Sequence, residues 1–322
     1  MLYLKKPTSI QLEEYYNSIK DKIKVSTKIN AAAQTFLSPT KIKKIITDTP
    51  ENLLIHHNAF MNELIPGFNI AEYENYFVFK KLKTKTGDQN AIISKYEITD
   101  EVLEMFNYDK YISTSKSTSY NLAMKLSRNT CTYCNRLYTN TIVKGKGSND
   151  ASRITRPQFD HWFAKSMYPL LALSFYNLIP SCSVCNSSIK GDTNFELTTH
   201  MHPYLKKEAD FSFSFYFKNV AENNVKIIPS SNPKVNKILE EFKIAEVYNA
   251  HSHLELKDLL DLKYKYTENY INTLFTESFK KLGVSKEEAY RLIFGVEFNE
   301  ADFHKRSFSK FKKDILKELK VI

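Results

Sequence analysis

Apolar residues recur at helical spacing in both outer parts of the chain, whereas the middle carries shorter apolar runs. Apolar positions three or four residues apart predict amphipathic helices. Thr8 or Ser9 can cap the first of them. In the first part, the pattern predicts helices over 10–20, 39–46, 50–64, 70–83, 97–107 and 117–127. In the last part, it predicts helices over 234–242, 253–275, 285–294 and 307–319.

Alternating or aromatic-rich runs predict strands nearer the middle. Residues 211–217 and 225–228 are predicted to pair as a β-hairpin, and the aromatic-rich segment that begins at Gln158 indicates another strand. Residues 141–156 are polar and predict a surface loop. We therefore expect an α+β fold in a mainly helical chain. The expected division is a helical region at 1–128, a central region at 129–204, and a β-hairpin followed by a helical region at 205–322.

Composition narrows the class of protein. Hydrophobic residues make up 42% of the 322 residues, which is enough for a proper core, and no Gly-rich nucleotide motif occurs. The start is polar and no apolar run approaches the roughly 18 residues of a membrane span. We therefore expect a cytoplasmic protein that does not contact a membrane. The net charge of +10 is compatible with a phosphate-rich partner and equally with a basic protein that binds no nucleic acid.

All four cysteines lie in two Cys-x-x-Cys pairs, Cys131 with Cys134 and Cys182 with Cys185. Thiolates at this spacing point to the same side of a turn, and two such pairs complete a tetrahedral zinc site. Stable disulfides are rare in the cytosol. The alternatives are four unligated core cysteines, or a redox pair, which would need a strand–helix context that neither motif has. We expect a structural zinc ion.

A second pattern lies between the cysteine pairs. Asp160 and His161 are adjacent, Asn177 follows in FYNLIP, and Asn186 comes directly after Cys185. Taken singly, these residues have ordinary explanations as a turn aspartate, a strand histidine and a helix-capping asparagine. Taken together with the cysteines, the words CTYCNR, FDHWFAKS, FYNLIPSC and CNSSIKG resemble the HNH endonuclease family of ββα-metal nucleases. The resemblance covers residues 131–204, and Ala164 departs from it where many members carry proline.

The resemblance implies a zinc-bound nuclease core at 129–204 that hydrolyses phosphodiester bonds. His161 would be the general base that activates a water molecule. Asp160 and Asn186 would hold one catalytic divalent cation, Mg²⁺ or Mn²⁺, through oxygen ligands. Asn177 would fix the loop that carries His161 by hydrogen bonds to its backbone.

Basic residues near these motifs favour a polyanionic substrate. Between positions 131 and 191 the chain carries seven basic residues and only two acidic ones. Lys190 and Arg136 are the expected phosphate contacts, although a local structural bond is the alternative for Arg136. The pattern at His200 and His202 is more typical of packing than of catalysis.

We therefore expect a metal-dependent endonuclease that cleaves DNA, with double-stranded DNA as the expected substrate. A setting in phage defence or restriction is an analogy to the family only. Two alternatives stay open. One is a zinc-stabilised nucleic-acid-binding module without cleavage, and the other is an accessory subunit that acts only beside a protein partner such as an ATPase.

Overall fold

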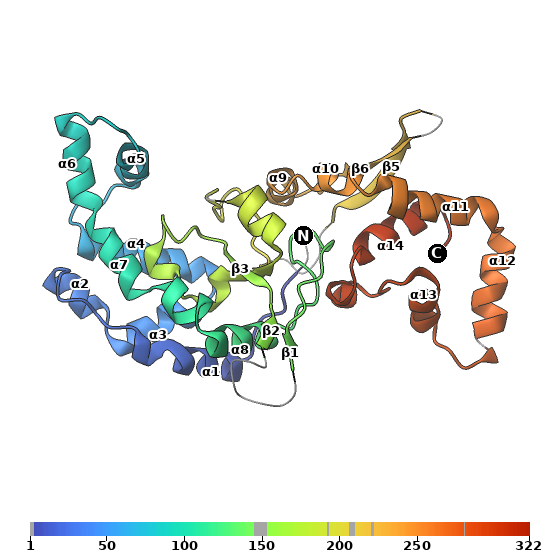
Figure 1. The fold of residues 1–322 in the computed structure, drawn as a ribbon, viewed down its shortest axis with the longest axis horizontal. Helices are drawn as coiled ribbons and strands as arrows, with labels where there is room; N and C mark the ends of the chain where they lie inside the picture. Colours follow the sequence, from blue (N-terminus) through green and yellow to red (C-terminus); the bar gives the residue numbers. More distant parts are fainter. Residues whose placement is uncertain (1–2, 145–152, 192, 206–209, 220–221, 280) are drawn as a thin grey trace.

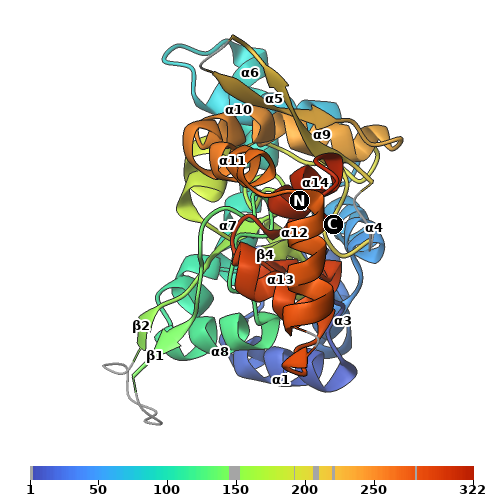
Figure 2. The ribbon, with the colours of Figure 1, turned by 90° about the vertical axis from the view of Figure 1, so that its right-hand side faces the viewer.

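The computed structural model describes residues 3–144, 153–191, 193–205, 210–219, 222–279 and 281–322. The chain forms a mixed α+β fold, as the sequence predicts, with long helical parts and small sheets. Figure 1 shows the N-terminal helices on the left, strand β3 near the middle and the C-terminal helices on the right. The view in Figure 2 shows β1 and β2 extending away from the body beside helix α8.

The N-terminal helices follow the predicted pattern closely. Their bounds are α1 Ser9–Ile19, α2 Ala31–Phe36, α3 Pro39–Thr47, α4 Pro50–Leu64, α5 Ile70–Lys80, α6 Gly87–Tyr96, α7 Ile98–Met105 and α8 Lys116–Leu126, with short turns η1 Lys20–Lys22 and η2 Asp109–Ser113. Thr8 caps α1 and forms a capping box with Gln11. Helices α2 and α6 escaped the prediction. Helix α6 begins in a stretch that looks like a loop, where Thr86 and Gln89 form a second capping box.

The central region contains two small antiparallel pairs of strands and ends in a helical turn. Its elements are β1 Ile142–Val143, β2 Arg153–Thr155, β3 Gln158–His161, η4 Pro169–Leu171, η5 Phe175–Asn177, β4 Leu178–Ser181 and η6 Val184–Lys190. Strand β3 pairs with β4 so that His161 lies opposite Leu178 and Gln158 opposite Ser181. Strands β1 and β2 pair at the two ends of the segment that the sequence predicts as a surface loop. The rest of that segment, 145–152, lies outside the described residues.

The C-terminal region opens with the predicted hairpin, which the structure confirms. Its elements are β5 Ser212–Phe217, β6 Asn223–Ile228, α9 Pro233–Glu241, α10 Ile244–Asn249, η7 Ser252–Leu256, α11 Lys257–Lys265, α12 Glu268–Thr273, η8 Leu274–Phe279, α13 Lys286–Phe294, η9 Glu300–Lys305 and α14 Ser309–Glu318. The prediction of one helix over 253–275 is wrong. Tyr266 is extended, and Thr267 accepts a hydrogen bond from the N–H of Tyr270 and so starts a new helix.

N-terminal helices pack directly on the central region. The Tyr15 hydroxyl donates to the Leu173 carbonyl at 2.8 Å, and the Ser174 hydroxyl donates to the Ile45 carbonyl at 2.6 Å. Both bonds are buried, so each satisfies a polar group that would be costly to leave unpaired. The helices therefore form one wall of the central region, in the same continuous hydrophobic core.

Asn135 fastens the C-terminal region to the segment that holds the first cysteine pair. Its side-chain amide donates to the carbonyls of Phe303 and Arg306 and to the Thr130 hydroxyl, at 2.9, 3.2 and 2.9 Å. The backbone carbonyl of Asn135 accepts from the N–H of Phe308 at 2.8 Å. Its φ of 50° is left-handed, a conformation that asparagine tolerates better than most residues.

We expect Asn135→Asp to destabilise the protein by about 2–3 kcal/mol, because the amide donors are replaced by a carboxylate that faces carbonyl oxygens. Aspartate also tolerates the left-handed conformation, so the backbone is unaffected. Urea unfolding followed by circular dichroism measures the loss. The exposed Asn140→Asp is the matched control. Equal unfolding midpoints for the two variants would contradict this account of Asn135.

Candidate functional site

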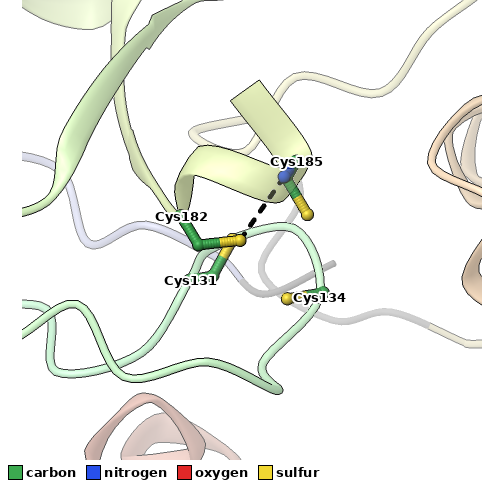
Figure 3. Close-up of side chains that lie close together, drawn as sticks. All are labelled: Cys131, Cys134, Cys182 and Cys185. Carbon is green, nitrogen blue, oxygen red and sulfur yellow. Dashed lines mark hydrogen bonds between the residues drawn. The ribbon is translucent and has the colours of Figure 1, made fainter. Parts of the chain in front are cut away.

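Four buried cysteines converge between the two strands of the central region and the loop that follows α8. Cys131 and Cys134 come from that loop, and Cys182 and Cys185 from the turn where β4 runs into η6 (Figure 3). One sulfur atom from each lies within 4.8 Å of all the others. In a tetrahedral site with Zn–S bonds of about 2.3 Å, neighbouring sulfurs are about 3.8 Å apart. The four sulfurs therefore need only a small contraction to hold one metal ion.

The backbone around the cysteines is also arranged for thiolates. The N–H of Arg136 donates to the sulfur of Cys134, and the N–H of Cys185 donates to the sulfur of Cys182, both at 3.4 Å. Hydrogen bonds from the Cys131 thiol and from other neighbours hold the pKa of Cys134 well below its ordinary value. An all-sulfur set of this kind suits zinc. The prediction that both pairs form a single metal-binding site is confirmed at the level of geometry.

The metal centre leads directly into a cleft. Strand β4 runs into the second cysteine pair, and η6 carries Cys185 before contributing Asn186, Ser187 and Lys190 to the cleft wall. All four residues of β3 also line the cleft. The cleft has a volume of about 450 Å³. Its wall includes four residues that the sequence singles out: Asp160, His161, Asn186 and Lys190. Tyr108 and Asp109 from the N-terminal region also line it, as do Arg156 and Lys165, and Lys165 is paired with Asp109 at 2.7 Å.

His161 occupies the end of β3 and is nearly buried at 9% exposure. Its Nε2 lies 3.0 Å from the carbonyl oxygen of Ala172, and the Tyr108 ring packs edge-on at 4.5 Å. Burial lowers the pKa of His161 to about 3, so the imidazole is neutral near pH 7. Because a carbonyl can only accept, Nε2 carries the proton and Nδ1 keeps a lone pair. The ring is therefore oriented to accept a proton at Nδ1.

Asp160 is held at both carboxylate oxygens. Oδ2 accepts from the Tyr133 hydroxyl at 2.5 Å, and Oδ1 lies 3.1 Å from Nζ of Lys190. The same ammonium donates to the carbonyl of His161 at 2.8 Å and faces the Phe195 ring at 4.9 Å. Lys190 is thus buried against the strand end, and the surface contact with phosphate that the sequence suggests stays a prediction.

Asn186 is partly exposed at the first turn of η6. Its amide nitrogen donates to Oε1 of Gln158 at 2.9 Å, and this bond fixes the Asn186 side chain to β3. Asp160 and Asn186 both line the cleft, and the carboxylate and amide oxygens of these residue types are hard donors of the kind that Mg²⁺ and Mn²⁺ prefer.

Asn177 lies behind the cleft and is fully buried. Its Oδ1 accepts from the N–H of Phe163 at 2.7 Å, and its Nδ2 donates to the carbonyls of Phe163 and Leu171 at 3.1 and 3.0 Å. Its backbone carbonyl also accepts from the N–H of Trp162. These bonds tie the segment after His161 to the start of β4.

Arg136 lies elsewhere. It is not part of the described cleft wall, and its Nη1 lies 2.9 Å from Nε2 of His251 in the C-terminal region. In this structure it makes the local structural contact that the sequence leaves open as an alternative.

Three residues of the site carried no recognisable signal in the sequence. Tyr108 and Gln158 pack on or beside predicted site residues, and Tyr133 joins Asp160 to the cysteine loop. Tyr133 is the only one inside a motif, since it stands between Cys131 and Cys134. A tyrosine at that position looks like core packing until the position of Asp160 is known.

Comparison with families of known proteins, with curated proteins and with solved structures found no match to this chain. Across the part of the chain that the structure describes, no helix combines the length and the apolar character needed to cross a lipid bilayer.

We expect the purified protein to carry one equivalent of zinc and to unfold more easily when a strong chelator removes the metal, because metal binding stabilises only the folded state. Elemental analysis and thermal unfolding measure both effects. Cys134→Ser should lose the zinc, while Ser183→Ala, an exposed substitution between Cys182 and Cys185, should keep it. A structural metal site would be contradicted if the protein contained no zinc and if neither the chelator nor Cys134→Ser changed its thermal unfolding.

Buried histidines should make the fold sensitive to acid. Burial lowers the pKa of His57 and His202, like that of His161, to about 3. In the unfolded chain these groups take up protons near pH 6.5, so between pH 6.5 and 3 the unfolded state binds more protons and is favoured. Each histidine should therefore cost about 1.4 kcal/mol of stability per pH unit in the lower part of this window.

The slope of the unfolding free energy against pH, from urea titrations between pH 7 and 4.5, tests this expectation. His57→Leu should reduce the slope by about one proton, because neither ring nitrogen of His57 has a hydrogen-bond partner among the described residues. His253→Leu is the control, since that side chain is exposed. An unchanged slope in His57→Leu would rule out His57 as a contributor.

Proposed function

We propose that this chain is a metal-dependent endonuclease of the HNH type that hydrolyses phosphodiester bonds in DNA. The observation that carries the proposal is one arrangement. His161, Asp160 and Asn186 line one cleft. They come from two antiparallel strands and a helical turn that lie next to the four converging cysteines. A neutral imidazole beside hard oxygen donors is what base-assisted, cation-dependent hydrolysis requires.

His161 acts as the general base in this proposal. Its Nε2 proton is committed to the Ala172 carbonyl, so Nδ1 is the atom that takes the proton from the attacking water. Asn177 keeps the ring in place indirectly, by fixing the backbone of Phe163 and Trp162. Burial keeps the imidazole neutral, with a smaller contribution from the charge of Lys165, but it also makes His161 a weak base, because a general base works best with a pKa near the operating pH.

Asp160 and Asn186 are the residues that would hold a divalent cation, Mg²⁺ or Mn²⁺. When bound, such a cation offsets the negative charge that grows on the phosphate and the leaving oxygen. Asp160 retains lone pairs for it beside the bonds from Tyr133 and Lys190.

The charge around the cleft supports a nucleic-acid substrate. Arg156, Lys165 and Lys190 line it together with the acidic Asp109 and Asp160, so the lining carries a small net positive charge. Lys165 pairs with Asp109 at 2.7 Å and Lys190 with Asp160 at 3.1 Å. Arg156, whose guanidinium donates to the carbonyls of Pro157 and Ser113, is therefore the lining residue expected to contact a phosphate. We propose double-stranded DNA as the substrate, in a cytoplasmic role such as phage defence or restriction, with an ATPase among the possible protein partners.

The engagement of both oxygens of Asp160 favours a second candidate. Since Lys190 already offsets the charge of this carboxylate and Tyr133 donates to its other oxygen, Asp160 needs no cation in the cleft. The chain would then be a zinc-stabilised nucleic-acid-binding module, either alone or as an accessory subunit. This candidate differs from the first in requiring no catalytic metal and no base at position 161.

Cleavage of plasmid DNA and of RNA, with and without Mg²⁺ or Mn²⁺, tests the proposal. His161→Ala should reduce the cleavage rate by about 10²–10⁴-fold, the usual contribution of a general base, while DNA binding measured by fluorescence anisotropy stays unchanged. His253→Ala, in an exposed histidine away from the cleft wall, should cut normally. Cutting by His161→Ala at the wild-type rate removes the assigned base. Binding by the wild type without any metal-dependent cutting favours the binding module.

A further inference from the structure

Tyr133 forms a direct link between the zinc centre and the cleft. In the sequence it stands between Cys131 and Cys134, the expected metal ligands, and its side chain is fully buried. Its hydroxyl donates to Oδ2 of Asp160 at 2.5 Å. Its ring stacks on Phe242 of the C-terminal region, with centroids 4.0 Å apart. One side chain therefore touches three parts of the molecule: the cysteine loop, the cleft carboxylate and the C-terminal helices.

We propose that Tyr133 is a positioning residue that makes the cation affinity of the cleft depend on the zinc centre. The inference rests on the proposed function, because it concerns the carboxylate that would hold the catalytic cation. Tyr133 itself touches no substrate. It acts through Asp160, whose orientation it sets from the side opposite Lys190.

The geometry makes the coupling rigid. Cys131 and Cys134 flank the tyrosine on either side, so a metal ion on their sulfurs fixes the backbone from which the ring projects. The neighbouring Thr132 binds the carbonyl of Pro180 in β4 through both its N–H, at 3.2 Å, and its hydroxyl, at 2.7 Å. These two hydrogen bonds and a bound metal ion together fix the position of the cysteine loop relative to β4.

The two donors to Asp160 have different origins. Lys190 is the last residue of η6, five residues after Cys185, and Tyr133 stands between Cys131 and Cys134. The segments that carry the two cysteine pairs thus each supply one group that holds one carboxylate oxygen. Groups behind a metal ligand orient it and tune its basicity, and their loss typically weakens metal binding by 10–100-fold.

Tyr133→Phe separates this role from packing, because it keeps the ring on Phe242 and removes only the hydroxyl. The probe is Mn²⁺, with its binding to the full zinc-loaded chain measured by electron paramagnetic resonance. We expect Tyr133→Phe to keep one zinc and to bind Mn²⁺ about tenfold more weakly. Tyr138→Phe, an exposed tyrosine in the same segment, should match the wild type, and Asp160→Asn should lose the site.

Cleavage supplies a second readout. In Tyr133→Phe the Mn²⁺ concentration that gives half-maximal cleavage should rise about tenfold, while the rate at saturating Mn²⁺ changes little. Wild-type Mn²⁺ affinity in Tyr133→Phe, or Mn²⁺ binding that survives Asp160→Asn, overturns the inference. Loss of zinc from Tyr133→Phe also overturns it, because the tyrosine would then serve the metal centre alone.

The outcomes also separate this inference from the proposed function. If the wild type does not cut but binds Mn²⁺ in a manner that depends on Asp160 and Tyr133, the nuclease proposal is rejected and the positioning role of Tyr133 is retained. A wild type that cuts, with Tyr133→Phe indistinguishable from it in Mn²⁺ affinity, keeps the nuclease and removes the positioning role.

Discussion

The convergence of four sulfur atoms is the constraint on which the rest of this structure depends. Cys131 and Cys185 are far apart in sequence, and their pairs come from a loop and from the end of a strand. Four buried thiols without a metal would lose solvation and gain little in return, whereas one ion turns them into a crosslink across the central region. The segment between the pairs, which includes β3 and β4, is thereby closed into one loop.

The outer regions complete what the crosslink begins. The N-terminal helices supply Tyr108, which packs on His161, and the hydrogen bonds that fix the turn before β4. The C-terminal region grips the other side of the cysteine loop, where the Tyr248 hydroxyl donates to the carbonyl of Cys134 at 2.6 Å. The central strands are only four residues long, too short to be stable alone. Their stability therefore depends on the surrounding helices and, when the four cysteines hold a metal ion, on that crosslink.

Buried polar contacts give the cleft its chemistry. Asp160, Lys190 and Tyr133 form a closed set in which each charge has a partner, as a buried ion pair requires. His161 is kept neutral by burial and turned by one carbonyl. Such networks have low tolerance for substitution, because removing one member leaves another buried and unpaired. The same property lets a residue outside the cleft, such as Tyr133, influence the cleft.

Much of this could be predicted from local patterns. Short-range rules of periodicity, helix starts and metal-ligand spacing account for the helix capped by Thr8, the helix that begins at Pro50, the hairpin at 211–228 and the pairing of the cysteine motifs. Helix α6 was missed because its capping box sits inside a loop-like composition, and the break at Tyr266 was missed because helical periodicity continues across it.

The sequence by itself determined the α+β class, the cysteine ligands and the candidate residues Asp160, His161 and Asn186, because each depends on residue type at a fixed spacing. Only the tertiary structure decided their partners. It turned Lys190 inward to Asp160, directed Arg136 to His251, and brought Tyr108 and Tyr133 to the site. The physical reason is that these contacts join residues from separate elements, and no local pattern encodes which distant side chain will fill a buried position.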